Sequence, residues 1–214
     1  MKKYFLILCI FLVSFFLYFG IASNFTFKPK WALDYINPLA LSLLQFRLDI
    51  PSPASTYDLA YFNGKWYAPW GILPALFLMP LQLIMGRFVP IIYLTLFLAS
   101  LDIVLVYLLL SRLKREFFPN LSQLAIVSLL TLYAFGTTHV YVGTLGSTWH
   151  VVQMVSNFFG TAGIYVIFKK KRTLRDYFFS TCLISVTLLG RTTIVFLTLL
   201  PIVLFLSEYL LKKD

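Results

Sequence analysis

The sequence has little charge and few acidic residues. Only 12% of its 214 residues are charged, and Asp and Glu together number 8. A soluble domain carries about 25% charged residues, whereas 60% of this chain is hydrophobic, so the composition is that of a membrane protein. The net charge of +10 comes from Lys and Arg residues that gather at the ends of apolar runs. This placement is not that of a nucleic-acid-binding surface, and we expect the lipid bilayer, and no nucleic acid, as a partner.

Residues suited to metal binding are also scarce. The two cysteines, Cys9 and Cys182, both lie inside apolar segments, where they are typical of small buried side chains and predict neither a disulfide nor a zinc site. His139 and His150 are eleven positions apart, which is not a zinc spacing. The chain has no internal repeat and no low-complexity tract. We therefore expect no metal site and no cofactor.

Long apolar runs, in contrast, are abundant, and a helix needs about 20 such residues to span a bilayer. The first run also suits a secretory signal, because Ile21-Ala22-Ser23 resembles a cleavage site, but it is longer than the apolar core of a signal and no soluble domain follows it. We expect an all-α fold: a polytopic transmembrane helical bundle of about six spans, forming a single transmembrane domain over residues 1–214. The expected spans are Tyr4–Ala22, Phe88–Leu110, Leu121–Thr138, Trp149–Phe168, Tyr177–Leu189 and Thr192–Leu211.

Basic residues predict the orientation of these spans. Two loops are rich in Lys and Arg, and the positive-inside rule places both in the cytoplasm. Because successive spans alternate in direction, both termini are expected in the cytoplasm, next to Lys2-Lys3 and Lys212-Lys213. We therefore expect a multi-pass protein of the inner (plasma) membrane. Tyr177–Leu189 is short for a span, so we expect Gly190-Arg191 below the outer surface in a protein-lined recess. The basic loop residues are Arg112, Lys114, Arg115, Lys169, Lys170, Lys171, Arg172 and Arg175.

Residues 23–86 are predicted to form the extracytoplasmic loop. Ser23–Tyr67 is polar, and within it the apolar spacing of Pro38–Leu48 predicts a short amphipathic helix on the membrane surface. Trp70–Gly86 is apolar but contains Pro74 and Pro80. Arg112 is expected in the cytoplasm, so an odd number of spans must separate it from the outer loop. Phe88–Leu110 is one such span, and we therefore interpret Trp70–Gly86 as a juxtamembrane or re-entrant helix that does not cross the membrane.

On this topology one face of the protein gathers the residues suited to chemistry. An acid near the outer surface can act as a general base toward a hydroxyl group, and a nearby Arg or Lys can bind a lipid-linked phosphate. Aromatic residues of the loop suit stacking on sugars, although an interfacial belt is the more ordinary explanation for them. Asp49 is expected to pair with Arg47, and the buried Asp102 to hydrogen-bond within the bundle rather than relay protons. The gathered residues are Asp34, Asp49, Asp58, Lys65, His139, His150, Gln153 and Arg191.

The run DLAYFNGKWYAPWGILPALFLMP resembles the first-loop signature of GT-C glycosyltransferases, in which an acid precedes a Gly-Lys-aromatic-Tyr turn and a Pro-rich juxtamembrane helix. Arg87, the Arg-Leu-Lys-Arg segment, Phe-Gly-Thr, Ser-Thr-Trp-His and Gly-Arg-Thr continue the likeness, which is strongest to bacterial relatives of protein O-mannosyltransferases and aminoarabinose transferases. The chain covers only the amino-terminal half of that family. It has a single acid after the first span where members often have two.

The resemblance implies an inverting enzyme that depends on a polyprenyl-phosphate-linked sugar donor and transfers the sugar to a hydroxyl acceptor on the extracytoplasmic face. It implies that Asp34 is the catalytic acid after the first span, that Asp58 is the second loop acid and that Arg191 contacts the donor phosphate. We further expect Lys65, Tyr67 and His150 to bind substrate, and the reaction to need no metal.

Two other functions fit the sequence. A transporter or flippase of lipid-linked substrates is expected to show repeated halves, broken helices and several buried ionisable groups. A non-catalytic scaffold subunit of a membrane enzyme is the second alternative.

Overall fold

The computed structural model describes residues 2–29, 31–86 and 88–209, and most of them are helical. This confirms the all-α prediction; Arg87, Lys212 and Lys213 lie outside the described residues. The helices are α1 (Lys2–Ala22), α2 (Ile36–Leu44), α3 (Leu73–Met85), α4 (Ile91–Glu116), α5 (Gln123–Gly136), α6 (Thr138–Thr144), α7 (Thr148–Ile167), α8 (Leu174–Val186) and α9 (Leu199–Tyr209). Two 3-10 helices, η1 (Thr187–Leu189) and η2 (Thr192–Thr198), connect α8 to α9.

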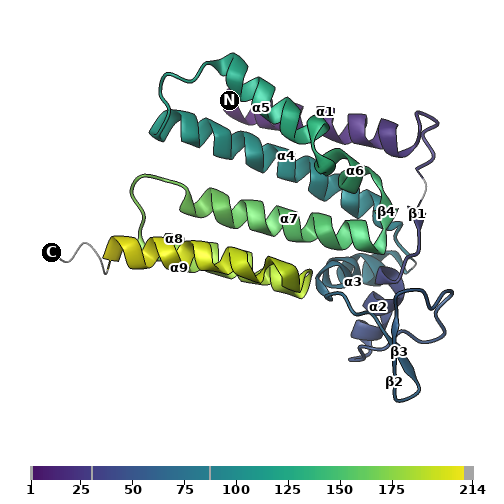
Figure 1. Cartoon of the computed structure of the whole chain (residues 1–214). Coiled ribbons are helices and arrows are strands. Elements are labelled where there is room, and N and C mark those ends of the chain that lie inside the picture. Colours follow the sequence, from purple (N-terminus) through teal and green to yellow (C-terminus); the bar gives the residue numbers. More distant parts are fainter. Residues whose placement is uncertain (1, 30, 87, 210–214) are drawn as a thin grey trace.

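The long helices lie alongside one another and form a bundle (Figure 1). Helix α4 contacts α1, α5, α6 and α7, and α7 contacts α8. Local sequence signals set several helix starts. The Ser122 side chain accepts a hydrogen bond from the Ala125 amide at the start of α5, and Thr173 and Asp176 form a capping box at the start of α8. Such side chains satisfy amide groups that have no partner within the helix.

Three helical segments are long and apolar enough to cross a membrane: Tyr4–Ala22 in α1, α4, and Thr192–Tyr209, which joins η2 to α9. A fourth results if α5 and α6, which meet at a bend of 54°, are counted as one span. The predicted six spans are therefore not confirmed. Helix α7 carries the polar residues His150, Gln153 and Asn157, and α8 has only 13 residues.

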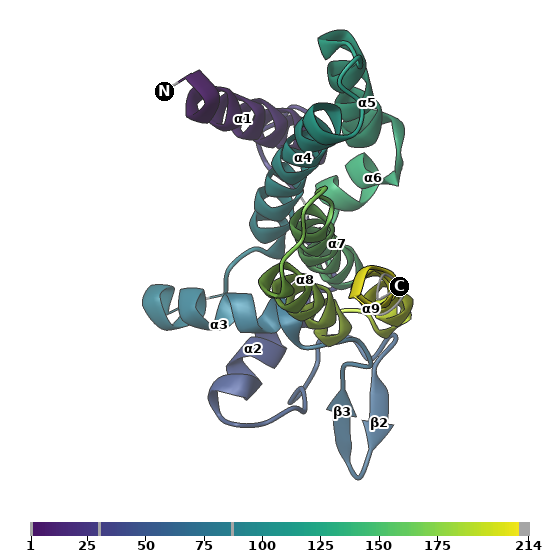
Figure 2. The same cartoon turned by 90° about the vertical axis from the view of Figure 1, so that its left-hand side faces the viewer.

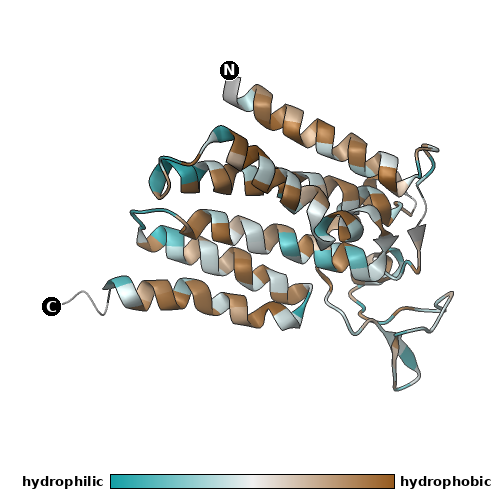
Figure 3. Cartoon of the chain, turned by 45° about the horizontal axis from the view of Figure 1, so that its top comes forward, coloured by the Kyte–Doolittle hydropathy of each residue, from teal (hydrophilic) through white to brown (hydrophobic). Residues whose placement is uncertain are grey.

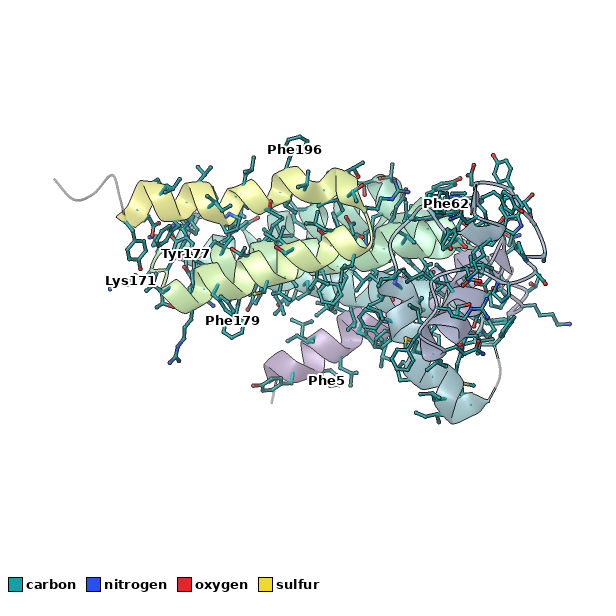
Figure 4. The ribbon with its side chains drawn as sticks, turned by 90° about the horizontal axis from the view of Figure 1, so that it is seen from below. Phe5, Phe62, Lys171, Tyr177, Phe179 and Phe196 are labelled. Atoms are coloured by element: carbon teal, nitrogen blue, oxygen red, sulfur yellow. The ribbon has the colours of Figure 1, made fainter. Side chains whose placement is uncertain are left out.

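The outside of the bundle is apolar. Hydrophobic colour runs along the helices, and hydrophilic colour concentrates in the connecting loops (Figure 3). Phe5, Phe179 and Phe196 come from three different segments, point outward in Figure 4 and are 56–77% exposed. An exposed aromatic surface of this extent is suited to hydrocarbon rather than water, in agreement with a membrane protein.

The stretch between the third and fourth expected spans, His139–Thr148, is expected to be a short outer loop, but most of it is helical. Residues 139–144 form most of α6, which follows α5 after Thr137, whose side chain accepts a hydrogen bond from the His139 amide at 3.2 Å. Because Thr137 has extended backbone angles, the helix breaks there and changes direction. The hydropathy pattern showed where the apolar span ends, but it did not predict the short helix α6 that follows.

Arg112, Lys114 and Arg115, predicted in a loop, instead belong to the end of α4, and this end and the basic loop before α8 lie on the side of the bundle where α1 begins and α9 ends (Figure 1). The backbone amide of Lys170 donates to Glu116 at 2.8 Å, so the end of α4 and the loop before α8 are in contact. Lys169 pairs with Asp176 at 2.6 Å, and Arg172 pairs with Glu208 of α9. In Figure 4, Lys171 lies at this end of the molecule and Phe62 at the opposite end.

Helices α2 and α3 pack together at the opposite end of the bundle. Viewed along the bundle, α3 runs across the direction of the long helices (Figure 2). Helix α2 begins two residues before the predicted Pro38 and ends at Leu44 rather than at Leu48. Helix α3 begins at Leu73 rather than at Trp70, and Gly86, with a φ of 61°, ends it.

Two pairs of short strands complete this end. Strands β2 (Ala60–Phe62) and β3 (Lys65–Tyr67) form an antiparallel hairpin. Its turn residues Asn63 and Gly64 both have positive φ, as a two-residue hairpin turn requires. Strands β1 (Trp31–Ala32) and β4 (Gly146–Ser147) pair in parallel and attach the segment after α1 to the start of α7.

Candidate functional site

A cavity of about 320 Å³ lies at the end of the bundle that carries the hairpin. We call it the tryptophan cavity. It brings together Asp58 of the loop and Arg191 of the connection between η1 and η2, which are both site residues predicted from the sequence. Its lining consists of Asp58, Pro69, Trp70, Gly71, Trp149, Gly190, Arg191, Thr192 and Thr193.

A close backbone contact between two glycines builds this cavity. The amide of Gly71, just before α3, donates to the carbonyl of Gly190 at 3.1 Å. A Cβ atom on Gly71 would lie 1.7 Å from the Leu189 carbonyl oxygen, and one on Gly190 would lie 2.2 Å from Oγ of Ser156. Only glycine permits this approach. Because Trp70 and Arg191 are the neighbours of these glycines, the contact holds both at the cavity.

Aromatic side chains form one wall. The rings of Trp70 and Trp149 are stacked, with centroids 6.0 Å apart and an interplanar angle of 18°. Tyr57 meets Trp149 edge-on at 6.1 Å, and Tyr35 meets Trp70 edge-on at 5.7 Å. The indole Nε1 of Trp70 is buried and has no hydrogen-bond acceptor among the described residues. The wall thus offers flat apolar surface, which suits a sugar ring.

Asp58 and Arg191 give the cavity opposite charges. Asp58 is exposed and has a φ of 60°, and the carbonyl of the preceding Tyr57 accepts a hydrogen bond from the Tyr35 hydroxyl at 2.8 Å. Arg191 is half-buried, and its backbone amide donates to Thr187 at 2.7 Å. Neither charged side chain forms an ion pair within the part of the chain that the structure describes. Both are therefore available to a ligand.

Asp34 lies elsewhere. Its Oδ1 accepts hydrogen bonds from the amides of Ile36 and Asn37, both at 3.0 Å, and its Oδ2 accepts one from the Asn37 side chain at 2.5 Å. Asp34 therefore caps α2. It lines a larger cavity of about 710 Å³, formed with α2, residues 51–55 and Phe88. Burial raises the pKa of Asp34 above its ordinary value, although the hydrogen bonds from Asn37 and Ile36 oppose this.

Lys65 and Tyr67 belong to the hairpin and do not line the tryptophan cavity. The ammonium group of Lys65 is 3.9 Å from Asp49, and Tyr67 forms an isolated bridge with the same residue. Asp49 also receives two hydrogen bonds from Arg47, which hold the pKa of its carboxyl below the ordinary value. This is the local pairing of Asp49 and Arg47 that the sequence suggested.

His150 lies in the first turn of α7, next to Trp149 of the cavity wall. Its Nδ1 is 2.5 Å from the Ser147 hydroxyl, and its ring meets Tyr141 edge-on at 5.4 Å. It is thus near the cavity but does not line it. Trp149 was not singled out as a ligand contact from the sequence, because a Trp at the start of a predicted span is also typical of a membrane interface.

Asp102 forms a hydrogen-bonded cluster inside the bundle, as the sequence predicted. The Tyr133 hydroxyl donates to its Oδ2 at 2.5 Å, and Nε2 of His139 lies 3.2 Å from the same oxygen. Nδ1 of His139 is 2.8 Å from the hydroxyl of Tyr18, so the cluster joins α1, α4, α5 and α6. Oδ1 of Asp102 is buried without a partner among the described residues.

The described residues contain no group of three or more His, Cys, Asp or Glu side chains placed to hold a metal ion. The fold and the cavity define an α-helical protein with helices suited to a membrane and a polar site at one end of its bundle. Comparison of the chain with protein-family models, with curated proteins and with solved structures gives no match.

Proposed function

We propose that the protein is a membrane glycosyltransferase of the GT-C type. It transfers a sugar from a polyprenyl-phosphate donor to a hydroxyl acceptor on the extracytoplasmic face, with inversion at the anomeric carbon. The observation that carries the proposal is the tryptophan cavity, which is lined by two stacked tryptophans and by a carboxylate and a guanidinium that form no ion pair among the described residues. These are the groups that transfer from a glycosyl phosphate requires.

The proposed orientation has six spans with both termini in the cytoplasm. Its support is the position of the basic residues at the end of α4 and before α8, which lie opposite to the hairpin and the tryptophan cavity. Helix α3, which crosses the bundle direction, would lie at the outer membrane surface. A polyprenyl phosphate presents its phosphate at that depth, so donor and cavity would meet there.

Each group of the cavity has a role in the proposed reaction. Arg191 holds the donor phosphate with its fork of N–H groups, and Trp149 with Trp70 stacks on the sugar. Asp58 accepts the proton of the acceptor hydroxyl. The acceptor oxygen forms a bond to the anomeric carbon as the bond to the phosphate oxygen breaks, and the polyprenyl phosphate leaves with its charge balanced by Arg191.

Asp34 is the competing general base. The family resemblance favours it, whereas the geometry favours Asp58, because Asp34 uses both oxygens to cap α2 and does not line the cavity that contains Arg191. In our proposal Asp34 positions the segment that carries Tyr35, whose hydroxyl holds the backbone next to Asp58.

The test uses the full chain in lipid nanodiscs with a panel of radiolabelled polyprenyl-phosphate sugars and hydroxyl acceptors. We expect Asp58→Asn and Arg191→Gln each to reduce transfer at least about 100-fold, the scale of general-base and oxyanion contributions. Lys28→Gln, which removes an exposed cation of the same loop, is the control and should retain full activity. Wild-type transfer by Asp58→Asn, with loss in Asp34→Asn, would assign the base to Asp34 instead.

One observation favours a transporter or flippase of lipid-linked substrates. The bend of 54° between α5 and α6 lies beside the buried Asp102–His139 pair, and broken helices near buried ionisable groups are typical of transporters. Movement of labelled polyprenyl-phosphate sugar across vesicles, without covalent product, would support this function. A chain inert in both assays fits the third interpretation, a scaffold subunit.

A further inference from the structure

A second cavity, of about 240 Å³, adjoins Arg191. We call it the amide cavity, because Gln153 and Asn157 line it. We propose that the amide cavity is an oxyanion subsite that binds the phosphate ester of a lipid through Arg191, Gln153 and Asn157. The binding of the lipid phosphate does not depend on the proposed function; only the presence of a sugar on that phosphate rests on it. The lining consists of Tyr133, Thr137, Thr138, His139, Val142, Gln153, Asn157, Arg191 and Ile194.

The donors that face this cavity are not used by the protein. Gln153 and Asn157 are four residues apart on α7, so they lie on the same face of that helix. Neither side chain, nor the guanidinium of Arg191, forms a hydrogen bond or an ion pair within residues 2–29, 31–86 and 88–209. Two amide groups and a guanidinium present up to nine N–H donors. Their convergence on one cavity indicates a ligand rich in acceptors.

Three other polar side chains of the lining, those of Tyr133, Thr137 and His139, are already engaged, whereas the Thr138 hydroxyl forms no hydrogen bond among the described residues. The Tyr133 hydroxyl donates to Asp102, and the Thr137 hydroxyl donates to the carbonyl of Tyr133 at 2.8 Å. Both ring nitrogens of His139 face partners, namely Tyr18 and Asp102. The donors left for a ligand are therefore those of Arg191, Gln153 and Asn157, together with the Thr138 hydroxyl.

Charge selects the class of ligand. The lining includes one arginine and no carboxylate among the described residues, and Asp102 lies behind Tyr133 and His139 rather than in the lining. Arg191 is half-buried, so its positive charge attracts an anion more strongly than it would in bulk water. A phosphodiester carries a single negative charge and several acceptor oxygens, which matches one guanidinium and two amides.

Arg191 lines both the amide cavity and the tryptophan cavity. A glycosyl phosphate has its sugar bonded directly to its phosphate, so one molecule fits with the sugar against Trp149 and the phosphate against Gln153. The apolar residues Val142 and Ile194 complete the lining of the amide cavity. They give the lipid chain an apolar path away from the phosphate, which a free phosphate ion would not use.

The experiment measures equilibrium binding to the full chain in nanodiscs, without an acceptor, by the fluorescence of the tryptophans beside Arg191. The probes are polyprenyl phosphate without sugar, the uncharged polyprenol, and inorganic phosphate. We expect polyprenyl phosphate to bind at least about 10-fold more tightly than either of the other two, because hydrogen bonds to charged groups add to the apolar contact of the chain. Equal binding of polyprenol would overturn the oxyanion site, and equal binding of inorganic phosphate would overturn the lipid source.

Variants test the assigned residues. The double variant Gln153→Leu/Asn157→Leu keeps the helix and its volume while removing the amide donors, and we expect it to weaken binding of polyprenyl phosphate about 10- to 100-fold. Gln123→Leu, an exposed amide at the start of α5, is the matched control and should bind like the wild type. Circular dichroism and the melting temperature check that each variant is folded. Unchanged binding by a folded double variant would refute the assignment.

This outcome is separable from that of the proposed function. If polyprenyl phosphate binds as expected but no sugar is ever transferred, the oxyanion subsite stands and the glycosyltransferase proposal fails. If sugar transfer occurs and is unaffected by Gln153→Leu/Asn157→Leu, the glycosyltransferase proposal stands and the oxyanion subsite fails.

Discussion

The pair of Asp102 and His139 provides the sharpest test of how this bundle is held together. Asp102 is fully buried, and its hydrogen bonds come only from Tyr133 and His139 within the described residues. His139→Leu leaves the carboxyl group with a single partner in an apolar interior. Removal of one member of a buried pair costs about 3–5 kcal/mol, because the remaining group stays desolvated.

The double variant Asp102→Leu/His139→Leu should be less destabilised than His139→Leu alone. It removes both members of the pair, and replacement of a whole buried pair by apolar residues is often neutral. The hydroxyl of Tyr133 then loses its acceptor, which costs about 1–3 kcal/mol. The hydroxyl of Tyr18 keeps the carbonyl of Ala134, to which it donates at 2.5 Å. We therefore expect the double variant to unfold about 1–3 kcal/mol more easily than the wild type.

The assay is reversible unfolding in mixed micelles of mild detergent and dodecyl sulfate, followed by circular dichroism. A double-mutant cycle over the wild type, both single variants and the double variant gives the coupling energy. His150→Leu serves as the control, because His150 is half-buried and its ring hydrogen-bonds, among the described residues, to Ser147 alone. A cost below about 1 kcal/mol for His139→Leu, or strictly additive effects of the two substitutions, would refute the argument from burial.

Two further predictions concern the end of the bundle that carries the hairpin. Gly71→Ala should separate α3 from Gly190 and reduce sugar transfer, since its Cβ would lie 1.7 Å from a backbone oxygen; Gly160→Ala, whose nearest neighbour would be 3.4 Å away, should retain transfer in the same assay. Asp34 binds a proton more tightly in the folded protein than in the unfolded chain because burial raises its pKa above the ordinary 3.8. Its contribution to stability is therefore complete below pH 3.8 and is lost as the pH rises through the raised pKa. Unfolding of Asp34→Asn measured across this range should lack that dependence, and an identical pH profile in both proteins would contradict it.

Local patterns predicted the features that depend on neighbours in sequence. The apolar runs indicated the helices of the bundle, Asn63-Gly64 indicated the turn of the hairpin, and the closeness of Arg47 to Asp49 indicated their ion pair. These structures arise from periodicity, turn geometry and local charge, which are visible in a single sequence.

Features that depend on distant residues were missed. The pairing of β1 with β4 joins residues 31–32 to residues 146–147, and no periodicity reports a contact over that separation. The capping role of Asp34 was also missed, although the sequence contains a signal for it. A carboxylate at the start of a helix typically accepts hydrogen bonds from the backbone amides two and three positions further along the chain. Asp34 stands in that relation to Ile36 and Asn37.

The short length of α8 explains why Arg191 serves two cavities. Thirteen α-helical residues rise about 20 Å and the three residues of η1 about 6 Å, whereas the hydrocarbon core is about 30 Å thick. If α8 starts at the cytoplasmic surface as proposed, the chain reaches Gly190 a few ångströms below the outer boundary. A break at that depth places a guanidinium where water is scarce but a lipid phosphate is within reach. The same break brings Gly190 against Gly71, so the feature that shortens the span also assembles the tryptophan cavity.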